Sequence, residues 1–166
     1  MSDLEEKVNN LTAQTEALSR RLSEVEQLNI RLRKALDFGK PVTMIEGSSG
    51  ITYSVIALEG SKKEKVIIIR MQVSTKNDVN TLMLAYGFEK PSIVDVNGTR
   101  YEAQETEIGG TGLLEIYRGV PVNASITFKG IEPESVVDIK LLKVTNTVDY
   151  SSSDQLLFKN LKVDWK

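Results

Sequence analysis

The sequence contains no cysteine and no histidine among its 166 residues. Without cysteine the chain forms no disulfide and offers no thiolate to a metal or a substrate. Without histidine it has no imidazole base or imidazole ligand. The Ser-His-Asp and Cys-His catalytic arrangements are excluded by the same absences. We therefore expect a protein that is not an enzyme and that has no cofactor and no metal site.

A long apolar run and an excess of positive charge are also missing. No apolar segment approaches the roughly 18 residues of a membrane span, so we expect no membrane insertion. The 21 basic and 23 acidic residues give a net charge of -2, whereas nucleic-acid binders usually carry a clear basic excess. We expect no nucleic-acid partner. The polar N-terminal residues lack the apolar stretch of a secretory signal, so we expect synthesis in a cytoplasm.

Glycine, proline and aromatic residues are absent from residues 1–36, and all 11 Gly and all 4 Pro lie beyond them. In globular folds glycine and proline form turns and aromatic residues pack in the core, and an uninterrupted helix needs none of them. The composition therefore predicts two domains. Residues 1–38 are expected to form a helical oligomerisation stalk, and residues 39–166 are expected to form a globular head.

Apolar residues of the first segment recur at alternating steps of four and three residues, with the polar residues Thr15 and Asn29 at two of these positions. A parallel coiled coil buries such a stripe of two positions per heptad between helices. A helix folded back on the head would instead show about three apolar positions in each heptad. We therefore expect a parallel α-helical coiled coil. Its interface comprises Leu4, Val8, Leu11, Thr15, Leu18, Arg21, Leu22, Val25, Glu26, Asn29, Leu32 and Leu36.

The number of helices in this coiled coil is suggested by two polar features. Arg21 and Glu26 flank apolar core positions in a pattern that resembles the trimerisation motif of short parallel coiled coils. Asn29 occupies a core position of the kind that is associated with parallel dimers. We expect a parallel homotrimer, with a dimer as the alternative.

Residues 39–166 show the alternating pattern and the β-branched content of β-strands. The predicted strands cover residues 51–58, 66–73, 92–96, 99–106, 113–117, 122–128, 136–144 and 156–165. Residues 82–86 fit either a strand or a short helical crossover. The pair Asn97-Gly98 predicts a type I′ hairpin turn, because both central residues of that turn need positive φ. This spacing predicts an all-β sandwich, immunoglobulin-like or jelly-roll-like.

Three aromatic residues of the head lie nearest to expected loops or to the terminus. Tyr86, Tyr150 and Trp165 are the candidates for an exposed binding patch. Exposed aromatic side chains are enriched where proteins bind their partners. The sequence contains no group of residues that predicts a catalytic or cofactor-binding site.

A helical stalk followed by a β-rich head resembles the architecture of fibre, whisker and decoration proteins of bacteriophages and other viruses. The resemblance implies a non-enzymatic structural or adhesive protein of the virion. Its stalk would bind copies of itself and another virion or surface protein. Its head would bind a cell-surface glycan or protein. The alternative is a bacterial extracytoplasmic β-sandwich binding domain whose export signal is missing from this sequence, placed in the cell envelope or secreted.

Overall fold

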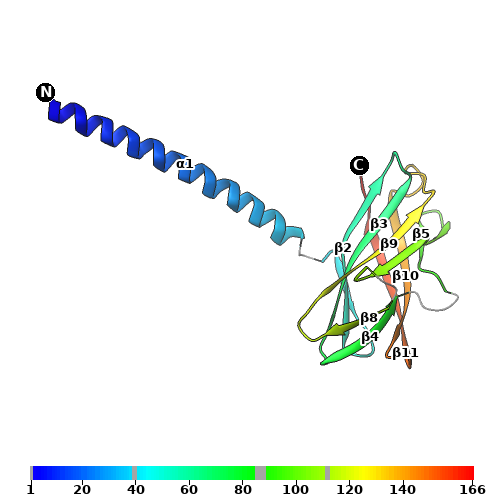
Figure 1. Cartoon of the computed structure of the whole chain (residues 1–166). Helices are drawn as coiled ribbons and strands as arrows, with labels where there is room; N and C mark the ends of the chain where they lie inside the picture. Colours follow the sequence, from blue (N-terminus) through cyan, green and yellow to red (C-terminus); the bar gives the residue numbers. More distant parts are fainter. Residues whose placement is uncertain (1, 39–40, 85–88, 111–112) are drawn as a thin grey trace. The chain divides into compact units, whose positions relative to one another are not determined.

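The computed structural model describes residues 2–38, 41–84, 89–110 and 113–166, and within the helix it describes the side chains of residues 7–28. The chain divides into two compact units, Met1–Lys40 and Pro41–Lys166. The first is a helix and the second is a β-sandwich (Figure 1).

The first unit is the single helix α1, Ser2–Phe38. Among residues 7–28, whose side chains are described, the large apolar residues are exposed to solvent by 54% to 65% of their surface. We call this set the apolar stripe, and it consists of Val8, Leu11, Leu18, Leu22, Val25 and Leu28. No helix in the described part of the chain is long and apolar enough to cross a membrane.

The prediction of a parallel coiled coil is wrong for this structure. A coiled coil needs at least two helices that pack against each other. The described residues form one helix, and the heptad positions within residues 7–28 face solvent instead of a second helix. Thr15, for example, uses its hydroxyl to donate a 2.8 Å hydrogen bond to the Leu11 carbonyl of its own helix. Four further expected interface residues, Leu4, Asn29, Leu32 and Leu36, lie outside the residues whose side chains are described.

The second unit confirms the predicted two-sheet β-sandwich. One sheet has the order β1-β2-β3-β9-β7, with β12 beside β2, and the other has the order β6-β5-β10-β4-β8, with β11 beside β10. The first sheet contains β1 Thr43–Glu46, β2 Ile51–Ser61, β3 Val66–Thr75, β9 Val122–Lys129, β7 Glu105–Ile108 and β12 Asp164–Trp165. The second contains β6 Arg100–Glu102, β5 Ser92–Asp95, β10 Asp138–Val148, β4 Val79–Leu84, β8 Leu113–Tyr117 and β11 Ser152–Lys162. All described pairings are antiparallel except the short pairing of β12 with β2.

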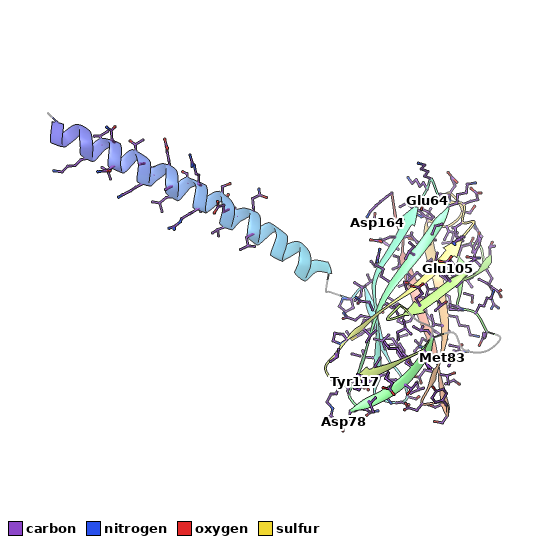
Figure 2. All side chains as sticks on the ribbon, viewed as in Figure 1. Glu64, Asp78, Met83, Glu105, Tyr117 and Asp164 are labelled. Atoms are coloured by element: carbon purple, nitrogen blue, oxygen red, sulfur yellow. The ribbon has the colours of Figure 1, made fainter. Side chains whose placement is uncertain are left out.

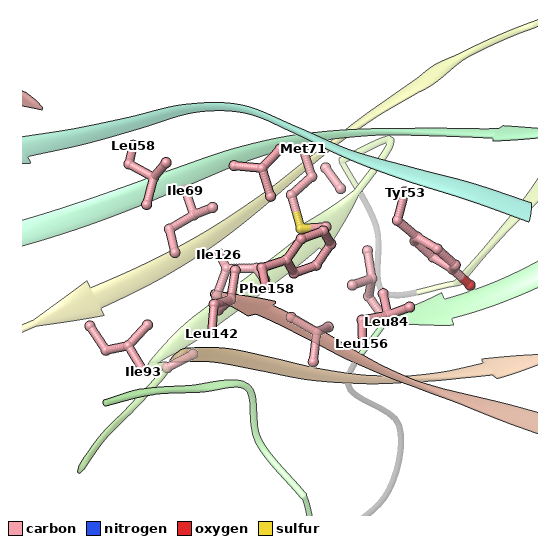
Figure 3. Close-up of a cluster of buried hydrophobic side chains, with 14 of the residues drawn as sticks. Tyr53, Leu58, Ile69, Met71, Leu84, Ile93, Ile126, Leu142, Leu156 and Phe158 are labelled. Atoms are coloured by element: carbon pink, nitrogen blue, oxygen red, sulfur yellow. The ribbon is translucent and has the colours of Figure 1, made fainter. Parts of the chain in front are cut away.

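The core lies between the two sheets, because alternate side chains of each strand point inward. In β3 the side chains of Ile67, Ile69 and Met71 are buried, whereas Arg70 between them is exposed. Figure 3 shows Ile69 and Met71 of one sheet facing Leu142 and Phe158 of the other. Burying a side chain of this size stabilises the fold by roughly 1.5–3 kcal/mol.

The segment predicted as one strand over residues 99–106 is two strands in different sheets. β6 pairs with β5, and β7 pairs with β9 of the opposite sheet. The chain crosses between the sheets at Ala103, which is buried and donates its backbone N–H to the Pro91 carbonyl at 2.8 Å. The ambiguous segment 82–86 is a strand as far as Leu84, and residues 85 and 86 lie outside the described residues.

The hairpin at Asn97-Gly98 exists, but its turn is not type I′. Only Gly98 has positive φ, at 83°. The Asp95 carboxylate instead accepts hydrogen bonds from the backbone N–H groups of Asn97 at 2.9 Å and Thr99 at 2.8 Å, which holds the turn in another conformation. Two successive residues with positive φ occur elsewhere, at Asp149 (49°) and Tyr150 (56°) between β10 and β11.

Candidate functional site

A hollow of about 460 Å³ opens on the surface of the head beside β4, β8 and the β10–β11 turn. We call it the tyrosine groove. It is lined by Thr81, Leu113, Leu114, Glu115, Tyr117 and Tyr150. Glu115 is the one charged side chain in this lining, and the remainder is apolar, aromatic or hydroxyl-bearing.

One wall of the groove is strand β8, which ends the order of its sheet and pairs only with β4 among the described strands. Glu115 and Tyr117 are exposed on one face of β8, whereas Ile116 between them is fully buried. The antiparallel register places Glu115 opposite Thr81 and Tyr117 opposite Val79. Because side chains directly opposite each other share a face, Thr81 and Glu115 point to the same side of the sheet. Figure 2 shows Tyr117 at this end of the head.

Tyr117 and Glu115 are joined to each other on this exposed face. The Tyr117 hydroxyl donates a 2.8 Å hydrogen bond to Glu115 Oε2. This bond and the negative charge of the same carboxylate raise the pKa of Tyr117 above its ordinary value. The bond engages one oxygen of the Glu115 carboxylate, so the second oxygen keeps its capacity to accept a hydrogen bond.

Tyr150 lines the groove from the turn between β10 and β11, and it is 69% exposed. Tyr150 and the preceding Asp149 both have left-handed backbone conformations. For residues other than glycine this conformation costs roughly 1–2 kcal/mol each, so neighbouring contacts must hold the turn in place. Strained backbone of this kind is often found where a side chain is presented for a function.

The contacts that hold the turn come from Asp149. Its carboxylate accepts hydrogen bonds from the Thr81 backbone N–H and from the Asn80 side-chain amide, each at 2.7 Å. Its own backbone N–H donates to the Thr81 carbonyl at 2.8 Å. Asn80 is in turn buried and accepts a 2.6 Å hydrogen bond from the Thr75 hydroxyl. The position of Tyr150 is thus linked through Asp149 to the buried ends of β3 and β4.

Of the three aromatic residues expected to form a binding patch, the structure places only Tyr150 in the groove. Tyr86 lies outside the described residues. Trp165 is half-buried in β12, packs against the core beside Gly60, and donates its indole N–H to the Val136 carbonyl at 2.9 Å. Tyr150 and Trp165 lie beyond opposite ends of the 11-residue strand β11, which is roughly 35 Å long. They do not share one surface.

Sequence reasoning missed Thr81, Glu115 and Tyr117 as site residues. The alternation of residues 113–117 contained a usable signal, because it places Glu115 and Tyr117 on the face opposite to Ile116. The contribution of Thr81 depends on the pairing of β4 with β8, which sequence spacing alone does not specify.

A second hollow of about 300 Å³ lies on the outer face of the other sheet. It is lined by residues that include Arg70, Glu107 and Ser125, and Arg70 is already paired with Glu59 at 3.0 Å. It has no aromatic side chain in its lining. Within the described ranges, no three Asp or Glu side chains are grouped so that they could hold a metal ion.

A buried polar cluster around Asp154 is the other concentration of reactive groups. The carboxylate accepts hydrogen bonds from the Ser48 hydroxyl, from the Ser48 backbone N–H at 2.9 Å and from the Tyr53 hydroxyl at 3.2 Å. Burial raises the pKa of the Tyr53 phenol, and the negative charge of Asp154 adds to this effect. Tyr53 has no exposed surface, so the cluster joins β2 to β11 from within the core rather than serving a ligand from solvent.

No family model and no curated protein matches the sequence. Solved structures with some likeness include a family 123 glycoside hydrolase from Clostridium perfringens (12% identity, TM-score 0.41), which matches over 65% of this chain and 22% of its own. The PapD-like domain 7 of human CEP192 has 14% identity and a TM-score of 0.38, with 76% and 90% of the two chains covered.

AggA, the major subunit of aggregative adherence fimbriae type I from Escherichia coli, has 14% identity and a TM-score of 0.40, with 74% and 98% covered. This chain therefore spans about a fifth of the length of the hydrolase and most of the length of the other two. All three TM-scores are low.

Proposed function

We propose that the protein is a non-enzymatic structural or adhesive component of a bacteriophage or viral particle. In this proposal α1 attaches the chain to its partners, and the β-sandwich head carries the surface that binds a target. The observation that carries the proposal is the apolar stripe of α1, in which six large side chains are each more than half exposed.

Exposure of this kind is unfavourable for a helix that stays alone in water. Most of the stability of a protein helix comes from packing its apolar face, and contiguous exposed apolar surface marks sites of protein association. Full burial of each Leu or Val of the stripe contributes roughly 1.5–3 kcal/mol. Other copies of this chain are the first proposed partner of the stripe.

The polar faces of α1 support an attachment role rather than a membrane role. Arg20, Glu24 and Gln27 are exposed beside the stripe, and the first 36 residues carry equal numbers of basic and acidic groups. A helix that lies on an anionic membrane surface usually carries an excess of Lys and Arg on its polar face. The balanced charge favours a protein partner.

The test is the concentration dependence of helix unfolding in the full-length chain, followed by circular dichroism. If copies cover the stripe, the melting temperature of the helical signal rises with chain concentration, because association stabilises by mass action. The Leu18→Glu/Leu22→Glu variant should lose this dependence. The matched control Ala17→Glu/Ser23→Glu adds the same charge on other faces of the helix and should keep it. A helical signal that melts independently of concentration in the wild type would overturn self-association.

The virion location is tested separately, by the genes beside the one that encodes this chain. Capsid or tail genes on either side support it. An upstream export signal in the same reading frame would instead support the extracytoplasmic binding domain.

A further inference from the structure

We propose that the tyrosine groove binds the neutral sugar units of a glycan. This inference depends on one part of the proposed function, namely that the head binds the target. It commits to one class of ligand, and it names Tyr117 and Tyr150 as the stacking residues and Glu115 as the main hydrogen-bond acceptor.

The groove combines aromatic rings with hydrogen-bonding side chains. A sugar ring presents an apolar face of C–H groups and a rim of hydroxyl groups. The exposed rings of Tyr117 and Tyr150, which are 51% and 69% exposed, offer flat surfaces for the C–H faces. The Glu115 carboxylate and the Thr81 hydroxyl lie in the same lining and can bind the hydroxyl groups.

The Glu115 carboxylate is held in position by its neighbour Tyr117. Glu115 Oε2 is fixed by the hydrogen bond from the Tyr117 hydroxyl, which leaves Oε1 to accept from a ligand hydroxyl. Hydrogen bonds to a carboxylate are stronger than those between neutral groups. Because the two side chains come from alternate positions of one strand, their separation is fixed by β8 rather than by a loop.

The backbone that carries Tyr150 is held in place. The Asp149 carboxylate ties the turn to Asn80 and Thr81, so the strained backbone that presents the tyrosine is held by three hydrogen bonds. A ring on a held backbone loses less freedom on binding than a ring on a mobile loop. The groove volume of about 460 Å³ suits a short oligosaccharide, and it lies within the usual range of small-ligand sites.

Charge selects among the possible sugars. Among the described lining residues Glu115 is the only charged one, and Asp149 lies next to Tyr150 in the chain. Arg118, the cation adjacent to Tyr117 in sequence, is paired with Asp78 at 3.1 Å. A negative site with no cation in its lining disfavours anionic ligands. The groove should therefore take neutral glycans and reject sialylated or sulfated ones.

The experiment applies the full-length chain to an array of neutral and sialylated oligosaccharides. Any neutral oligosaccharide that is retained is then titrated in solution by calorimetry. Tyr150→Asn removes the ring but keeps a residue that tolerates positive φ, so the turn is preserved. This variant and Tyr117→Ala should each weaken binding by at least about tenfold, as loss of a central aromatic contact does. Met44→Ala, an exposed apolar position in the other sheet, is the matched control and should bind as the wild type does.

Three results would overturn the proposal: no neutral oligosaccharide is retained, only sialylated ones are retained, or binding is unchanged in both tyrosine variants. Titration with a soluble sugar needs no association between chains, so it succeeds or fails independently of the role of α1. Conversely, Tyr150→Asn should leave the concentration dependence of helix melting unchanged.

Discussion

The carboxylate of Asp149 accepts a 2.7 Å hydrogen bond from the side-chain amide of Asn80, which is a buried residue 69 positions earlier in the chain. The bond joins the turn after β10 to the start of β4. It explains how the fold tolerates two successive residues with positive φ, and it fixes the backbone from which Tyr150 extends into the groove.

Replacing Asp149 by Ala should destabilise the head by about 1–3 kcal/mol. The substitution leaves the buried Asn80 amide and the Thr81 backbone N–H without their acceptor, and unsatisfied buried groups cost this much. Urea denaturation measures the change. Asp149→Asn keeps one acceptor oxygen and tolerates positive φ, so it should cost less than Asp149→Ala. Equal losses for the two variants would show that the turn does not depend on these hydrogen bonds.

Gly60→Ala should displace Trp165. A Cβ added at Gly60 would overlap the indole ring, which lies directly over this glycine. Because Trp165 is the only tryptophan, its fluorescence should shift to longer wavelength as the ring becomes exposed. The free energy of unfolding should fall by about 1–3 kcal/mol, which is typical of overpacking.

A double-mutant cycle provides the control for that substitution. In a Trp165→Ala background the ring is absent, so Gly60→Ala should cost much less than it does in the wild type. If Gly60→Ala lowers the free energy of unfolding equally in both backgrounds, the added methyl group is disfavoured by the backbone conformation at Gly60 rather than by the indole ring.

The buried Tyr53 should make stability fall at alkaline pH. Burial raises the pKa of Tyr53 well above its ordinary value of 10.0, so the folded state favours the neutral phenol. The contribution of the Tyr53 phenol to the free energy of unfolding is fully present below pH 10. It is lost as the pH rises from 10 toward the folded-state pKa. Denaturation curves measured at increasing pH should therefore show a steeper loss of stability for the wild type than for Tyr53→Phe. Parallel losses in the two proteins would contradict the raised pKa.

Glu115→Gln should lower the pKa of Tyr117 toward its ordinary value. The hydrogen bond to the Glu115 carboxylate is the largest cause of the raised pKa, and the negative charge of that carboxylate is the second. The ring signals of Tyr117, followed by NMR as the pH is raised, report the titration. The matched variant Glu107→Gln removes a carboxylate from the other sheet and should leave the Tyr117 titration unchanged.

Several strands of the head could be predicted from local pattern because one face of each strand is buried. β3 and β9 alternate throughout, and β2 alternates except at the bulge near Ala57; the predicted strands 51–58, 66–73 and 122–128 lie within these three strands. The break between β6 and β7 could not be predicted, because it depends on Ala103 packing between the sheets and on its contact with Pro91. The turn at Asp149-Tyr150 was missed because its positive φ values are imposed by contacts with Asn80 and Thr81 rather than by residue preference.

The groove combines residues whose proximity no local pattern specifies. Thr81, Glu115 and Tyr150 come from three separate segments that meet through the pairing of β4 with β8 and with β10.

For the helix, the local pattern predicted the element but not its packing. The heptad pattern predicted α1 correctly, but the coiled coil inferred from the same pattern needs a second helix, and the described chain provides only one.

The molar mass of the full-length chain in solution, measured by light scattering, tests the central claim most directly. If α1 attaches copies of the chain to one another through the apolar stripe, the mass is a multiple of 18.5 kDa. It then falls to the mass of one chain in Leu18→Glu/Leu22→Glu but not in Ala17→Glu/Ser23→Glu. A wild-type mass of 18.5 kDa at every concentration would contradict the account.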